Sequence, residues 1–142
     1  MKESKDILTS VLHTAQMGRT GIQAVLERAV KPGLKELMHQ QLQQYQMIER
    51  EASHLASDKG WTLPGRSIMV EKMANTCAKC RLITGDTDSV IAGMLIQGNT
   101  RGMILGIKNM NHSSTVDPEV TQLANKLLNL ENINIQKSQE FL

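Results

Sequence analysis

Apolar residues recur along most of the chain at intervals of three and four positions, the spacing that places them on one face of an α-helix. No run alternates convincingly between apolar and polar residues in the manner of a strand. The pattern predicts four long helices, over residues 4–30, 34–58, 88–111 and 118–142, and a shorter helix over residues 67–83. The fold class expected from this pattern is all-α.

Residues that end or begin helices separate these segments. Pro32 and Pro64, each followed by glycine, close the first two helices. Asp86 or Asp88 can cap the third long helix, and Asp117, with a proline directly after it, is a strong N-cap for the last. These signals agree with the apolar periodicity and set the expected helix boundaries.

The lengths of the connections predict how the helices are arranged. Short connections join the first helix to the second and the third to the fourth, which makes two antiparallel hairpins. The middle connection is long, and a helix of ~17 residues with two loops can cross the ~37 Å length of a bundle helix. We therefore expect one domain over residues 1–142: a ferritin-like four-helix bundle, two hairpins joined by a long crossover that contains a short fifth helix.

Composition narrows the class of protein. With 142 residues, 40% of them hydrophobic, and a net charge of +2, the chain can fold around one core. Its three aromatic residues and scattered basic residues argue against nucleic-acid binding. The N-terminus lacks the apolar run of a signal peptide, and no stretch approaches the ~20 apolar residues of a membrane span. Two cysteines without an export signal indicate a reducing compartment, so we expect a cytoplasmic protein.

Four stretches also resemble a known group of proteins: AQMGRTGIQAVLE, QQLQQYQMIEREA, MLIQGNTRGMILGIKNMN and LENINIQKSQEFL. They are similar to an uncharacterised family of bacterial ferritin-like bundles, related in pattern to rubrerythrin. The resemblance covers nearly the whole chain and implies the same fold. It implies no activity, because the family has no established one.

The sequence Glu51-Ala-Ser-His54 matches Glu-x-x-His, half of the motif by which ferritin-like bundles hold two iron ions. On a helical wheel, however, Glu51 and His54 flank the apolar face formed around Tyr45, Ile48 and Ala52. Both side chains are expected to point outward. The motif is therefore interpreted as a solvated helix surface, and no metal ligand or cofactor is predicted.

The partners of such an iron site are missing as well. The first helix has no carboxylate between Asp6 and Glu27, and the third has none over residues 89–111. In the fourth helix, Asn134 stands where the motif requires histidine after Glu131. The alternative left open is a degenerate metal site that uses Glu131 and Glu51.

Glu131 and Asn134 fall close to the apolar centre of their helix, and Gln41, Gln44 and the Tyr45 hydroxyl face inward from the second helix. A polar cluster inside the bundle is the expected result. It is interpreted first as a hydrogen-bond network that fixes the register of the helices. A ligand pocket is the alternative, and catalysis is not expected, because no pair of base and nucleophile is visible.

The third long helix contains Gly98, Gly102 and Gly106, one glycine in every four residues. Each costs about 1 kcal/mol relative to alanine inside a helix. Close packing of a neighbouring helix is the favoured explanation. A small-molecule pocket lined by Gly98 and Gly102, with Tyr45 and Glu131, is the alternative.

The same helix has a second apolar side, which could pack under the crossover or form a homodimer interface: Ala92, Ile96, Met103, Ile107 and Met110. We favour a homodimer.

Cys77 and Cys80 form a lone CxxC on the apolar side of the predicted short helix and are interpreted as buried, inert thiols. The function expected overall is a non-enzymatic, oligomeric binding or structural module.

Overall fold

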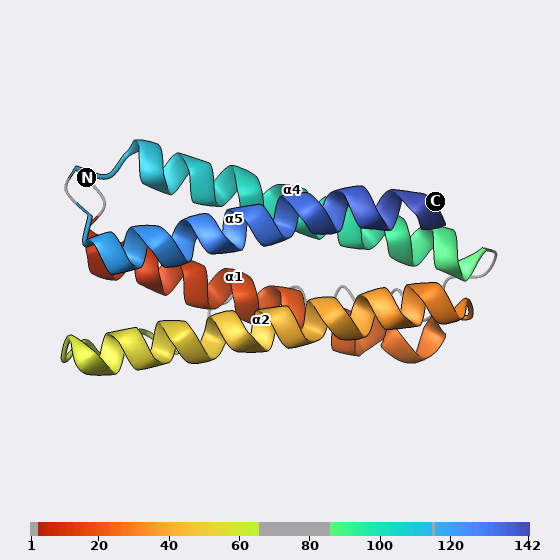
Figure 1. Ribbon diagram of the computed structural model, residues 1–142, viewed down its shortest axis with the longest axis horizontal. Coiled ribbons are helices and arrows are strands. Elements are labelled where there is room, and N and C mark those ends of the chain that lie inside the picture. The colour runs from red at the N-terminus through yellow and green to blue at the C-terminus, as the bar shows by residue number, and fades with distance from the viewer. Residues whose placement is uncertain (1–2, 66–85, 115) are drawn as a thin grey trace.

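A computed structural model of the chain describes residues 3–65, 86–114 and 116–142 (Figure 1). Its elements are α1 (Ser4–Val25), the 3-10 turn η1 (Leu26–Arg28), α2 (Pro32–Asp58), α4 (Thr87–Asn111), α5 (Pro118–Ser138) and η2 (Gln139–Phe141). Every regular element in the described part of the chain is a helix, which confirms the all-α class. The short helix predicted over residues 67–83, with Cys77 and Cys80, lies outside the described residues.

The four long helices pack side by side as two antiparallel hairpins, α1 with α2 and α4 with α5 (Figure 1). Each hairpin also contacts the other, since α1 packs on α4 and α5, and α2 packs on α5. Figure 1 shows that α2 ends at the opposite end of the bundle from the start of α4. Consequently α1 and α5 run in one direction and α2 and α4 run in the other.

The core lies along the axis between the two hairpins and is built from aliphatic side chains of all four helices. These side chains recur at helical spacing, so each helix turns one stripe inward. Core residues of the four helices include Ile7, Leu8, Val11, Ala15, Ile22, Leu34, Met38, Ile48, Ala52, Ile91, Leu95, Val120, Leu123 and Leu127.

Helix boundaries agree with the sequence signals except at Pro32. This proline was expected to close the first helix, but it is the first residue of α2, where its missing N–H and fixed φ suit the helix start. The first helix instead ends through the η1 turn. Asp86 is the N-cap of α4, its carboxylate accepting a hydrogen bond of 3.2 Å from the Ser89 backbone N–H.

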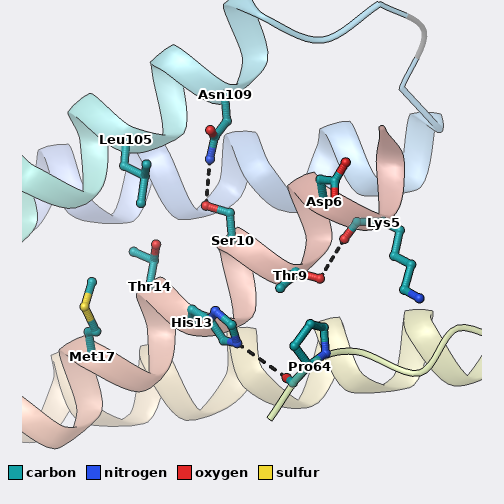
Figure 2. A pocket seen from close by; sticks show the side chains of 10 residues that line it. All are labelled: Lys5, Asp6, Thr9, Ser10, His13, Thr14, Met17, Pro64, Leu105 and Asn109. Atoms are coloured by element: carbon teal, nitrogen blue, oxygen red, sulfur yellow. Dashed lines mark hydrogen bonds between the residues drawn. The ribbon is translucent and has the colours of Figure 1, made fainter. Parts of the chain in front are cut away.

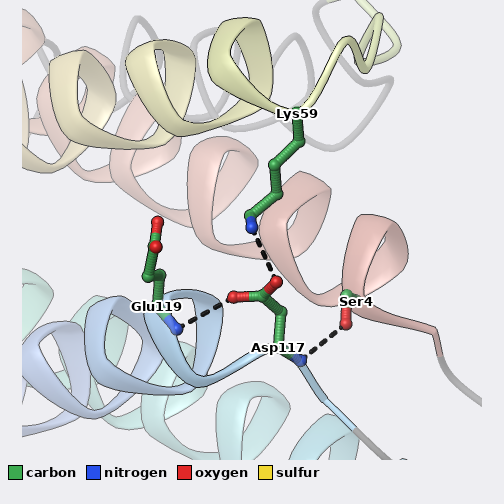
Figure 3. Close-up of polar contacts among 4 residues, drawn as sticks. All are labelled: Ser4, Lys59, Asp117 and Glu119. Carbon is green, nitrogen blue, oxygen red and sulfur yellow. Dashed lines mark hydrogen bonds and ion pairs between the residues drawn. The ribbon is translucent and has the colours of Figure 1, made fainter.

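Asp117 caps α5 as predicted and also joins three elements at one end of the bundle (Figure 3). Its carboxylate accepts hydrogen bonds from the backbone N–H of Glu119 at 3.0 Å and from Lys59 Nζ at 2.6 Å. Its own backbone N–H donates to Ser4 Oγ at 2.8 Å. The start of α5 is thereby attached to the end of α2 and to the start of α1.

Asp88 makes the equivalent connection at the other end. Its buried carboxylate accepts backbone N–H bonds from Val30 at 2.8 Å and Lys31 at 2.9 Å, in the turn between α1 and α2. Burial raises the pKa of Asp88, but these two hydrogen bonds and the charge of Lys31 outweigh it and hold the pKa below its usual value. The ionised Asp88 side chain of α4 thus holds the turn between α1 and α2 in place.

Candidate functional site

Polar side chains from α2 and α5 meet inside the bundle, where the two helices run antiparallel. Gln41 Nε2 donates to Ser138 Oγ at 3.4 Å. One turn further along α2, Gln44 Oε1 accepts a bond of 3.2 Å from Asn134 Nδ2. Gln41, Asn134 and Ser138 are almost completely buried. These bonds fix the register of α2 against α5, because a shift by one turn would separate both pairs.

Tyr45 continues this series and reaches α4. Its hydroxyl donates a bond of 2.7 Å to Asn99 Oδ1, and Asn99 Nδ2 donates to the Leu95 carbonyl at 2.8 Å. The ring covers Gly18 of α1, where an added Cβ would lie 2.5 Å from Tyr45 Cζ. Burial, and after it the charge of Glu131, raise the pKa of Tyr45 above its usual value. The phenol is therefore a neutral, fixed donor.

Glu131 and Gln41 each have a buried side-chain oxygen without a hydrogen-bond partner among the described residues. Glu131 is 1% exposed, and its oxygen without a partner is Oε2. The carboxyl group packs directly on Gly102 of α4, where an added Cβ would lie 2.8 Å from Glu131 Cδ. Burial raises the pKa of Glu131 to about 8. Near neutral pH the group is a protonated, uncharged carboxylic acid.

Three of the four glycines of α4, Gly98, Gly102 and Gly106, have different surroundings. Gly102 accommodates the Glu131 carboxyl, and Gly106 faces Leu128, whose Cδ2 would lie 2.9 Å from an added Cβ. At Gly98 an added Cβ would meet nothing within 4 Å. Close packing therefore explains Gly102 and Gly106. The structure brings Gln41, Tyr45, Gly102, Glu131 and Asn134 into one interior region, but not Gly98.

Glu51 and His54 lie outside this region. Glu51 pairs with Lys126 of α5 at 2.6 Å on the surface, and the exposed His54 lies 3.4 Å from Asp58. This confirms that the Glu-x-x-His motif faces outward. No group of three His, Cys, Asp or Glu side chains that could hold a metal ion occurs within the described ranges.

Two residues of the interior region were not identified from the sequence, Asn99 and Ser138. Asn99 follows Leu95 by one turn on the core side of α4, and Ser138 follows Asn134 by one turn on α5, so helical phase would have found both. Gln16 of α1 also has its Oε1 buried without a hydrogen-bond partner in the described part of the chain.

A separate cavity of about 500 Å³ lies between α1, α4 and the segment that follows α2 (Figure 2). Its walls include Ser10, His13 and Met17 of α1 and Leu105 and Asn109 of α4. None of the residues of the interior polar region lines it. This cavity thus lies on the α1 side of α4, away from Tyr45 and Glu131.

Compared with family models, with curated proteins and with solved structures, the chain finds no match. By length and composition alone, α4 is long and apolar enough to cross a membrane. It is the one such helix in the described ranges. Two basic residues, Arg101 and Lys108, interrupt the apolar run of this helix.

Proposed function

We propose that this chain is a ferritin-like bundle without a complete di-iron site, and that it acts in the cytoplasm as a non-enzymatic, homo-oligomeric binding or structural module. Support for the fold comes from the helix directions: α2 and α4 are parallel, and the end of α2 and the start of α4 lie at opposite ends of the bundle (Figure 1). The resemblance of the sequence to rubrerythrin-like bundles points the same way.

The observation that carries the proposal is the chemistry of the interior. A di-iron site needs a carboxylate from each of two helices and a Glu-x-x-His pair from each of the other two. Among the buried side chains described, only Asp88 and Glu131 are carboxylates. Asp88 is bonded to backbone N–H groups, and the Glu131 carboxyl packs on Gly102 of α4. Neither faces a second ligand.

The alternative of a degenerate metal site using Glu131 and Glu51 is less well supported. Glu51 is bonded to Lys126 at the surface, whereas the Glu131 carboxyl packs on α4 inside the bundle. A single iron would therefore require one of the two side chains to leave its present contacts.

Metal analysis tests the proposal. Protein purified without oxygen and incubated with excess ferrous iron should retain well under one iron per chain after desalting. About two irons per chain, lost in Glu131→Gln but kept in the surface variant Glu36→Gln, would overturn it. Equal retention in both variants would indicate surface binding, which leaves the interior without a metal site.

The homo-oligomer is proposed from the outer side of α4. Of the apolar stripe predicted there, Ala92 is buried, but Ile107 is 45% exposed, and Ile104 beside it is 54% exposed. Sedimentation should show a dimer that Ile104→Asp with Ile107→Asp converts to a monomer. Ile133→Asp, at an exposed apolar residue of α5, is the matched control and should leave the dimer intact. A wild-type monomer at all concentrations would remove oligomerisation from the proposal.

A further inference from the structure

The cavity between α1 and α4 has a polar floor and an apolar end (Figure 2). Figure 2 places Ser10 and Asn109 opposite each other across the two helices, and shows Met17 of α1 and Leu105 of α4 at the end away from Lys5, with Thr14 between them. A volume of about 500 Å³ is within the ~300–1,000 Å³ range of small-molecule sites. The question is which head group and tail this arrangement would accept.

The floor presents one hydrogen-bond donor and one acceptor. Asn109 Nδ2 donates to Ser10 Oγ at 2.7 Å. This bond uses a lone pair of the serine oxygen, so the Ser10 hydroxyl hydrogen can be donated to a ligand. The Oδ1 atom of Asn109 can accept a bond in the same way. A ligand head that both accepts and donates, as a primary amide does, would match this pair.

His13 forms a fixed side wall. Its Nε2 lies 3.0 Å from the Gly65 carbonyl oxygen and 3.4 Å from that of Pro64. Both partners are acceptors, so Nε2 carries the hydrogen and donates it. The imidazole thereby anchors the segment after α2 to α1, and in the neutral ring it leaves Nδ1 as a further acceptor.

Charge at the cavity is balanced. The charged side chains that line it are Lys5 and Asp6, one of each sign, at the end away from Met17. Asp6 also accepts a hydrogen bond of 3.1 Å from the Glu3 backbone N–H, which holds it at the start of α1. A ligand with a net charge would gain no excess of opposite charge here, which favours an uncharged head group.

From this geometry we infer that the α1–α4 cavity binds a small uncharged amphiphile, a primary carboxamide with a short alkyl tail. The amide bonds to Ser10 and Asn109, and the tail lies against Met17 and Leu105. The inference rests on the binding role in the proposed function. It does not depend on the interior of the bundle, so the iron experiment and the titration below can fail separately.

Titration of the full-length protein with hexanamide, hexanoate and hexylamine, followed by amide NMR shifts, tests the ligand class. These probes share the apolar tail length and differ in the charge of the head. Hexanamide should give saturable shifts around residues 5–17 and 105–109, with a dissociation constant at least several-fold below those of the charged probes. Tighter binding of hexanoate or hexylamine would overturn the class, and no saturable shift with any probe would overturn the site.

Ser10→Ala tests the floor of the cavity. Loss of one hydrogen bond should raise the hexanamide dissociation constant about fivefold. Ser53→Ala, on the exposed side of α2, is the matched control and should change nothing. Leu105→Ala tests the tail contact independently and should also weaken binding of hexanamide. It replaces Ser10→Ala as the test if circular dichroism shows that Ser10→Ala is unfolded. Unchanged affinity in both cavity variants would overturn the inference.

Discussion

At the scale of single residues, Glu131 is unusual because it is buried, protonated near neutral pH and short of a hydrogen-bond partner. The carboxyl has a pKa of 4.5 when unperturbed and about 8 in the folded protein. Between these values the folded chain holds a proton that the unfolded chain has released. The free energy of unfolding therefore falls as pH rises through this window, by at most about 1.4 kcal/mol per pH unit.

Glu131→Gln should remove this dependence. An amide of the same shape stays uncharged, so the variant should gain stability over the wild type as pH rises from about 5 to 8. Urea denaturation followed by circular dichroism at several pH values measures the difference. Glu36→Gln, on the exposed side of α2, serves as the control. Wild-type and Glu131→Gln curves that stay parallel over this range would show that Glu131 ionises normally.

Tyr45→Phe tests the contact between α2 and α4. The substitution keeps the ring over Gly18 but leaves Asn99 Oδ1 buried without the Tyr45 donor, at a cost of about 1–3 kcal/mol. Adding Asn99→Leu should recover part of the loss, because neither polar group is then left unpaired. Chemical denaturation of both variants checks this. If the double variant loses more unfolding free energy than the two single variants lose together, the pairing of Tyr45 with Asn99 is contradicted.

At the scale of elements, α4 contains two glycines that lie close to α5 side chains, Gly102 and Gly106, and one, Gly98, where an added Cβ would meet nothing within 4 Å. Gly102→Ala should destabilise the protein by about 1–3 kcal/mol, since the new methyl group would meet the Glu131 carboxyl. Gly98→Ala should instead stabilise it by up to about 1 kcal/mol through helix propensity. Thermal denaturation of the pair provides a matched comparison. Equal changes in stability for the two variants would mean that Gly102 and the Glu131 carboxyl are not in close contact.

The sequence predicted elements better than contacts. Helical periodicity and the caps Asp86 and Asp117 located the four long helices to within a few residues, because both signals are local. Helical phase also indicated that Glu131 faces inward. It could not show that the Glu131 carboxyl lies on Gly102, or that Gly98 faces open space, because these depend on the rotation and spacing of α4 against α5.

At the scale of the whole molecule, Asp88 connects the two hairpins at one end of the bundle. Asp88→Asn should cost about 1–2 kcal/mol, because two backbone N–H groups lose a charged acceptor. The folded pKa is lowered from 3.8, so this contribution is present above that value and is lost as pH falls through the folded pKa. Wild type and variant should therefore converge in acid.

Denaturation of Asp88→Asn at pH 7 and at about pH 3 measures this convergence. Asp58→Asn, near the exposed end of α2, controls for loss of a surface charge and should change stability little at either pH. If Asp88→Asn matches this control at pH 7, the connection between the hairpins does not depend on the carboxylate.

Membership of the ferritin-like class and the homodimer stay predictions. The first concerns relationship to other proteins, and the second concerns contact with another copy of the chain.

The contact of Lys59 with Asp117 has an optical consequence. Trp61, the one tryptophan of the chain, packs against the core at this end, with Lys59 Nζ 5.8 Å from the centre of its ring. Its fluorescence therefore reports whether α2, α5 and the start of α1 stay together there. Because Glu131 lies further along α5, the emission can separate fraying of this end from events in the middle of the bundle without any introduced label.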